Sequence, residues 1–210
     1  MPALSLGVLV SGTGTNLQAI LDAIDDKRLA ATVRVVISNK PGVAALERAE
    51  RHGVPTVTLS HKAYETREAF DAALVATLRE HDVQWVVLAG FMRLLTRTML
   101  DAYKNRIVNI HPSLLPAFPG VDAQRQAFDY GVKIAGCTVH LVDEGTDTGP
   151  ILMQRAVPVL DEDDAESLRA RILVEEHAVL VDTLRAIAGR ELVVTDAAPG
   201  LRARTRFGVR

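Results

Sequence analysis

Residues 4–16 read LSLGVLVSGTGTN, and their pattern indicates the class of fold. A continuous apolar run, Leu4–Val10, stops at a glycine-rich turn, Ser11–Thr15. A run that is apolar on both faces is typical of a buried parallel strand. The residues that follow, Asn16–Asp26, have the apolar spacing of an amphipathic helix. The stretch therefore predicts a buried strand, a tight turn and a helix.

The same alternation continues through the first half of the chain. Short apolar runs bounded by turn residues predict strands, and longer runs with helical spacing predict helices. The predicted strands are Val33–Ile37, Val54–Leu59, Gln84–Ala89 and Ile107–Ile110, and the predicted helices are Val43–His52 and Thr66–His81, with Thr66 as an N-cap. This order indicates an α/β fold with a mostly parallel central sheet and helices on both faces. Because ligands of such sheets bind beyond the carboxyl ends of the strands, the loops after the first, fourth and fifth strands are the candidate site.

The second half of the chain does not continue the alternation of strands and helices. Val132–Val142 and Ile151–Val159 predict two strands joined by a turn-rich loop, Asp143–Pro150. An antiparallel pairing of these strands would make the sheet mixed. A long charged helix is predicted over Asp164–Arg190, with Gly189 as the residue that closes it.

The C-terminal end is predicted to lie outside the main fold. We expect one domain over residues 1–210, with 191–210 as a C-terminal extension. The tail from Asp196 carries Pro199, Gly200 and several arginines, so we expect it to be solvated or loosely docked.

Composition narrows the class of protein. The 210 residues are 48% hydrophobic and 24% charged, as in soluble globular proteins, and the formal net charge of -2 does not favour a general nucleic-acid binder. A single cysteine, Cys137, excludes an internal disulfide and a multi-cysteine zinc site. No basic segment follows Met1, and no apolar run reaches the roughly 20 residues that cross a bilayer. We therefore expect a cytoplasmic protein that does not bind membranes.

The loop after the first strand has the composition of an anion site. Glycines let the backbone curl around an anion, and the following helix start offers free N–H groups and partial positive charge. The Walker lysine is absent, and Leu17 and Ser38-Asn39 stand where a dinucleotide site needs glycine and an acid. A phosphate monoester therefore fits better than ATP or NAD. The alternative is a tight turn that binds nothing.

A second polar group follows the fifth strand. Asn109 and His111, two positions apart, point to one face, and Pro112 ends regular pairing. Both can donate to an oxyanion, while Asp147 in the turn-rich loop could orient the histidine or take a proton. Each residue also has a structural reading, as a turn cap, a core histidine and an Asx-turn residue. His140 is the only other histidine placed to support them. The chain has no paired histidines at metal-ligand spacing, so no metal is expected.

Four motifs taken together resemble the folate-dependent phosphoribosylglycinamide formyltransferases of purine biosynthesis. They read SGTGTNLQ at 11–18, LAGFMR at 88–93, NIHPSLLP at 109–116, and GCTVH at 136–140 running on to DTGP at 147–150. The resemblance spans most of the chain and implies a Rossmann-like formyltransferase fold. It also implies transfer of the formyl group of 10-formyltetrahydrofolate, as co-substrate, to the amine of glycinamide ribonucleotide, which gives formylglycinamide ribonucleotide and tetrahydrofolate.

The resemblance assigns roles to residues that match the family motifs. Asn109 and His111 would stabilise the oxyanion after direct attack by the amine, and Asp147 would assist proton transfer without a covalent intermediate. The implied substrate-binding residues are Thr13, Gly14, Thr15, Asn16 and Glu176, and the implied folate-binding residues are Arg67, Met92, Arg93, Leu94, Leu95, Asp143, Glu144, Gly145 and Thr146. Two positions depart from the family pattern: Asp122, near a position where the family often has histidine, and Leu173, where some members have glutamine.

Other readings predict different behaviour. Methionyl-tRNA formyltransferases have alanine at the position of Pro112 and an added RNA-binding domain, and formyltetrahydrofolate deformylases have an added N-terminal domain. A non-catalytic folate or phosphosugar module would bind without turnover. Nucleic-acid binding through the tail arginines is the weakest alternative, and a homodimer is left open. Those arginines are Arg202, Arg204, Arg206 and Arg210.

Overall fold

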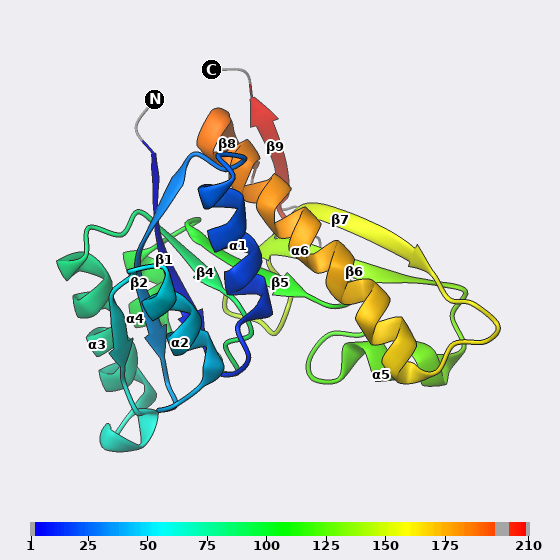
Figure 1. The fold of residues 1–210 in the computed structure, drawn as a ribbon, viewed down its shortest axis with the longest axis horizontal. Coiled ribbons are helices and arrows are strands. Elements are labelled where there is room, and N and C mark those ends of the chain that lie inside the picture. Colours follow the sequence, from blue (N-terminus) through cyan, green and yellow to red (C-terminus); the bar gives the residue numbers. More distant parts are fainter. Residues whose placement is uncertain (1–2, 196–201, 209–210) are drawn as a thin grey trace. The chain divides into compact units, whose positions relative to one another are not determined.

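The computed structural model describes residues 3–195 and 202–208 (Figure 1). The chain divides into two compact units, residues 1–109 and 110–210, and each is described by itself. None of the helices in the described ranges combines the length and apolarity that a bilayer span requires.

The first unit is built on parallel strands. They are β1 (Leu4–Val10), β2 (Ala31–Ser38), β3 (Thr56–Thr58), β4 (Trp85–Leu88) and β5 (Ile107–His111), and the last two residues of β5 begin the second unit. They pair in the order β3-β2-β1-β4-β5, every pair parallel. Strand β1 lies at the centre, where Val8 pairs with Val36 on one side and Val87 on the other. The parallel sheet predicted from the apolar runs is confirmed.

Helices cover both faces of this sheet. They are α1 (Thr15–Asp25), α2 (Ala44–Arg51), α3 (Arg67–Glu80) and α4 (Arg97–Ala102), with a short 3-10 helix, η1, at His61–Ala63. Because crossovers between parallel strands are right-handed, the reversal of strand order after β3 puts α1 and α2 on one face and α3 and α4 on the other. Figure 1 shows α1 and α2 in front of the strands. The hydroxyl of Thr66 accepts a hydrogen bond from the N–H of Ala69 at 3.0 Å, so the predicted N-cap of α3 is confirmed.

The second unit contains the predicted antiparallel pair. Strand β6 (Ile134–Leu141) pairs antiparallel with β7 (Ile151–Pro158), with Cys137 opposite Arg155. Helix α6 (Ala165–Gly189) packs on both strands, and its Leu168 and Ile172 side chains are fully buried. Its N-terminus is closed by a capping box in which Asp164 accepts hydrogen bonds from the first-turn N–H groups.

Five elements of the described chain were not predicted: the short helix η1, two further helices and two C-terminal strands. Helices α4 and α5 (Ala123–Tyr130) are short, and neither has the long periodic pattern that identifies a helix from sequence. The prediction of a solvated or loosely docked tail is wrong for residues 202–208. There β9 (Arg204–Gly208) pairs antiparallel with β8 (Glu191–Thr195), and both β9 and Arg202 donate hydrogen bonds to the segment 147–151. Asp196, Pro199, Gly200 and Arg210 lie outside the described residues.

Candidate active site

The loop between β1 and α1 has the conformation of an anion site. Gly14 has φ +73°, and a Cβ there would lie 2.6 Å from the Cβ of Ala45 in α2. Only glycine therefore lets the loop approach α2 so closely. Gly14 is also the N-cap residue of α1 and has no side chain to cap the first-turn amides. Those amides and the helix dipole are suited to bind a phosphate at this turn.

Side chains that are distant in sequence hold this loop in place. The Ser11 hydroxyl donates to the Asn39 side chain at 2.6 Å and accepts from the N–H of Met92 at 3.0 Å. The Arg48 guanidinium donates to the carbonyl of Thr13 at 2.8 Å, which brings positive charge to the loop. Sequence reasoning missed Arg48, because its position on α2 gives no local signal of a contact 35 residues away.

The segment after β4 exposes apolar side chains beside arginines. Met92 is 72% exposed and Leu94 57% exposed, whereas Leu95 is buried. Arg67 donates to the carbonyl of Leu94 at 2.8 Å, and the Arg93 guanidinium lies 5.3 Å from the centre of the Phe70 ring. Exposed apolar side chains beside cations suit a ligand that has a flat ring and an anionic tail.

A buried carboxylate anchors the far end of this segment. Asp71 is 2% exposed and accepts hydrogen bonds from the backbone N–H and the hydroxyl of Thr96 at 2.5 and 2.8 Å. Burial raises the pKa of Asp71, although the two hydrogen bonds and the charges of Arg67 and Arg93 oppose the rise. Asp71 therefore fixes the path of the chain from the exposed apolar side chains into α4.

The second unit brings His111 and Asp147 together. The Nδ1 atom of His111 lies 3.3 Å from Oδ2 of Asp147, and Nε2 lies 2.8 Å from the carbonyl oxygen of Phe118. Oδ2 of Asp147 also accepts from the N–H of Gly120 at 2.8 Å, and its Oδ1 lies 3.6 Å from Nε2 of His140. The carboxylate thus contacts three groups, and two of them, His111 and Gly120, lie far from it in sequence.

Burial and hydrogen bonding shift the pKa values of His111 and Asp147 in opposite directions. Burial lowers the pKa of His111, and the Phe118 carbonyl and the Asp147 carboxylate only partly offset it. Burial opposes ionisation of Asp147 too, but hydrogen bonds from His140 and Gly120 and the nearby His111 prevail, so the pKa of Asp147 is lowered. The ring nitrogens of His111 face two acceptors, and only the imidazolium could donate to both. The pair can therefore stabilise a proton gained by the ring during a reaction.

The loop between β6 and β7 has a backbone whose conformation is restricted by close contacts. Asp147 has φ +55°, a left-handed conformation that few residues other than glycine adopt. A Cβ on Gly149 would clash with the carbonyl of Leu141, and one on Gly145 would clash with the side chain of Thr148. Asp143 holds the turn by accepting from the hydroxyl of Thr148 at 2.6 Å. Strand ends and turn glycines thus set the direction of the Asp147 carboxylate.

The other predicted site residues lie as follows. Asn109 is half-buried in β5, two positions before His111. Glu176 is 6% exposed on α6, and with Glu175 it adds to burial in raising the pKa of the Cys137 thiol to about 12, so that thiol stays protonated. Asp143, Glu144, Gly145 and Thr146 are exposed. The described residues include no cluster of three or more histidine, cysteine or acidic side chains placed to hold a metal ion.

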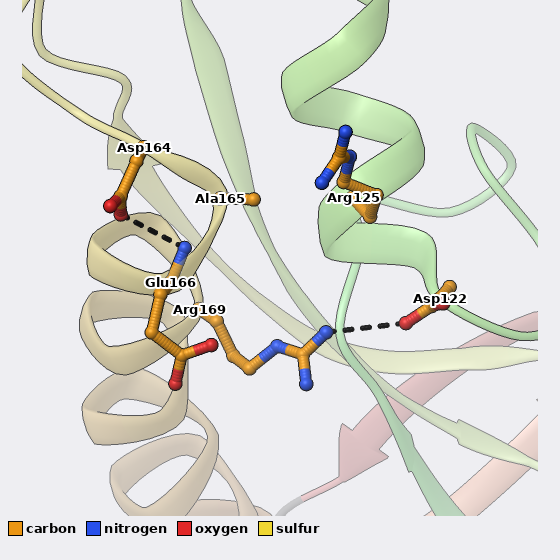
Figure 2. A pocket seen from close by; sticks show the side chains of 6 residues that line it. All are labelled: Asp122, Arg125, Asp164, Ala165, Glu166 and Arg169. Atoms are coloured by element: carbon orange, nitrogen blue, oxygen red, sulfur yellow. Dashed lines mark hydrogen bonds and ion pairs between the residues drawn. The ribbon is translucent and has the colours of Figure 1, made fainter.

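A pocket of about 360 Å³ opens at the N-terminal ends of α5 and α6 (Figure 2). Asp122, one of the two residues that depart from the family pattern, is the N-cap residue of α5 and pairs with Arg169 at 3.2 Å. Asp164 and Glu166 also line the pocket, so their negative charges offset the positive charges of its arginines. The Asp164 side chain accepts hydrogen bonds from the first N–H groups of α6, which are therefore already satisfied. None of the residues that line it was predicted as a site residue, and the mixed charge does not favour an anion.

Comparison with known proteins defines the class. The sequence profile of the formyl transferase family matches residues 5–184. The chain therefore belongs to the formyl transferase family, as its motifs indicated. The phosphoribosylglycinamide formyltransferase of Bacillus subtilis is 43% identical over 87% of this chain and 93% of its own length. The crystal structure of glycinamide ribonucleotide transformylase 1 from Symbiobacterium toebii superposes with a TM-score of 0.91 and 52% identity, over 98% of this chain and 94% of that one. The predicted formyltransferase fold is thus confirmed.

Some relatives are much longer proteins. The trifunctional purine biosynthetic protein adenosine-3 of Drosophila melanogaster is 51% identical over 82% of this chain. The chain spans only 13% of the length of that protein and 14% of the two other insect proteins of the same name. The match therefore concerns only a small part of each of these proteins.

Proposed function

We propose that this chain transfers the formyl group of 10-formyltetrahydrofolate to the amine of glycinamide ribonucleotide, in de novo purine biosynthesis. The products are formylglycinamide ribonucleotide and tetrahydrofolate. The observation that carries the proposal is the pair of buried His111 and largely buried Asp147, 3.3 Å apart, in a chain of the formyl transferase family. The near full-length relatives named above support the choice of acceptor.

In this proposal Asn109, His111 and Asp147 are the catalytic residues. The amine nitrogen attacks the formyl carbon, and donors from Asn109 and His111 stabilise the oxyanion that forms. To donate to the oxyanion, a ring N–H of His111 gives up its hydrogen bond to the protein acceptor that it meets in this structure. Asp147 stabilises positive charge on the ring and assists loss of the amine proton. The bond between the formyl carbon and the folate nitrogen breaks, and that nitrogen leaves with a proton.

The phosphate of the ribonucleotide is assigned to the loop after β1. Backbone amides and side chains of Thr13, Gly14, Thr15 and Asn16 would bind it, which accords with the uncapped start of α1. Glu176 is assigned to the ribose hydroxyls.

The folate donor is assigned to two segments. One contains Met92, Arg93, Leu94 and Leu95 with Arg67, and the other contains Asp143, Glu144, Gly145 and Thr146. The exposed Met92 and Leu94 support an apolar ring there, and Arg67 supports an anionic tail.

We also propose that residues 1–210 act as one formyltransferase domain, with 191–210 as its extension. Both substrates are small molecules, and no nucleic-acid partner is assigned. We place the protein in the cytoplasm, where purine synthesis would use it, and a homodimer is compatible with the proposal.

An absorbance assay tests the reaction. Purified protein is mixed with 10-formyltetrahydrofolate, with and without glycinamide ribonucleotide, and loss of the formyl-folate absorbance is followed. Turnover only with the ribonucleotide is the expected result. Turnover without it would indicate a deformylase, and ligand binding without turnover in either mixture would indicate a binding module. Either of these outcomes would refute the proposal.

A further inference from the structure

The C-terminal segment contacts the backbone next to Asp147. The Arg202 guanidinium donates from Nη2 to the carbonyl of Asp147 at 2.5 Å and from Nη1 to the carbonyl of Gly149 at 3.0 Å. The hydroxyl of Thr205, in β9, donates to the carbonyl of Ile151 at 2.5 Å. Three carbonyls at alternate positions of the loop therefore accept hydrogen bonds from residues 202–205.

These contacts complete the support of Asp147. Its side chain is held by the N–H of Gly120 and by His111, whereas its own carbonyl is held by Arg202. The residue has φ +55°, so its backbone needs such support to keep one conformation. A planar guanidinium can donate to two carbonyls at once, which a single ammonium group cannot do in the same geometry.

We propose that Arg202 is a positioning residue, which fixes the backbone of Asp147 so that its carboxylate meets His111. The inference rests on the proposed function and gives the C-terminal hairpin of β8 and β9 a role in it. The hairpin ties the loop between β6 and β7 to the end of the chain.

The charge of Arg202 also acts on the catalytic pair. The charged and titratable groups that face His111 are Asp147, His140 and Arg202. Burial is the main cause of the lowered pKa of His111, and the positive charge of Arg202 adds to it. Loss of that charge should therefore raise the pKa of His111, whereas loss of an exposed arginine farther along β9 should leave it unchanged.

The experiment compares Arg202→Ala with Arg206→Ala, which removes an exposed arginine from β9. We expect kcat of Arg202→Ala to fall about 10- to 100-fold, since displacement of a catalytic group by about 1 Å can cost 10²-fold in rate. The KM for the ribonucleotide should change less than about twofold, because no contact of its phosphate is removed. Arg206→Ala should match the parent within about twofold.

Two further variants separate charge from geometry. Arg202→Lys keeps the charge but not the double donation, so the pKa of His111 should return to the parent value while kcat recovers only in part. Thr205→Val removes one hydrogen bond of the same segment and should lower kcat several-fold. NMR titration of the histidine ring gives the pKa, and amide hydrogen exchange of residues 143–150 should speed up in Arg202→Ala.

The outcomes distinguish this inference from the proposed function. If the parent shows no ribonucleotide-dependent turnover, the proposed function fails, and the NMR titration with amide exchange still decides the role of Arg202. A folded Arg202→Ala variant with parent kcat, parent pKa of His111 and unchanged exchange would overturn the inference. If Arg202→Ala does not fold, Arg202→Lys and Thr205→Val provide the same readouts, and parent values in both would overturn it.

Discussion

Replacement of Asp147 by asparagine tests the catalytic pair most directly. Asparagine has nearly the same shape, and its amide oxygen can still accept from the N–H of Gly120, which lies 2.8 Å from the present carboxylate. The substitution therefore removes a charge next to His111 and leaves the main backbone contact of the side chain in place.

The size of the effect follows from the distance in the structure. An imidazolium 3.3 Å from a carboxylate oxygen is attracted by roughly 5 kcal/mol at an effective dielectric constant of about 20. The side chains of His111 and Asp147 are only 5% and 12% exposed, so solvent screens this attraction little. About 1.4 kcal/mol changes a rate tenfold, so the full term would be worth between three and four orders of magnitude. Since positioned acids and bases contribute 10²- to 10⁴-fold, we expect kcat to fall about 10³-fold.

The assay combines kinetics with titration of the ring. Steady-state turnover with the ribonucleotide gives kcat and KM, and NMR gives the pKa of His111. The Asp147 charge raises that pKa, so Asp147→Asn should lower it further. Asp129→Asn, which removes an exposed carboxylate from α5, is the matched control. A folded Asp147→Asn variant with kcat within tenfold of the parent, or with a raised pKa of His111, would refute the reasoning.

Three other predictions concern stability and the phosphate loop. Gly14→Ala should lower the free energy of unfolding by about 1–3 kcal/mol through strain and raise the KM for the ribonucleotide, whereas Gly12→Ala, which meets no atom within 4 Å, should leave urea unfolding unchanged. The pKa of His111 is lowered from 6.5, so below that pH the unfolded chain binds more protons than the folded chain. The free energy of unfolding should therefore fall as the pH drops below about 6.5. His111→Gln should flatten this part of the plot of unfolding free energy against pH. The lowered pKa of Asp147 should add a further loss as the pH falls below 3.8, measured by urea unfolding at each pH. Phe70→Ala, at a side chain 2% exposed, should cost about 3–5 kcal/mol in urea unfolding, and a loss below 1 kcal/mol would contradict the assignment of Phe70 to the core.

The parts of the fold that depend on local patterns could be predicted from the sequence. The apolar run of β1 is confirmed to the residue, because a buried parallel strand needs apolar side chains on both faces. The N-cap of α3 was readable because a threonine hydroxyl satisfies an amide only three residues away. His111 was readable as a candidate because it ends a parallel strand before a proline. The family motifs then gave roles that spacing alone left open.

The contacts that hold the candidate side chains could not be predicted from the sequence, because they form between separate elements of the folded chain. The N–H of Gly120 meets Asp147 across 27 residues, and the Arg202 guanidinium meets the same residue across 55. Neither contact leaves a local trace, since each depends on how separate elements pack. The arginine content of the tail predicted a solvated segment. In the structure, however, the backbone of β9 pairs with β8, and Arg202 donates hydrogen bonds to backbone carbonyls. Periodicity and turn chemistry act over a few residues, whereas the direction of a catalytic carboxylate depends on partners brought together by folding.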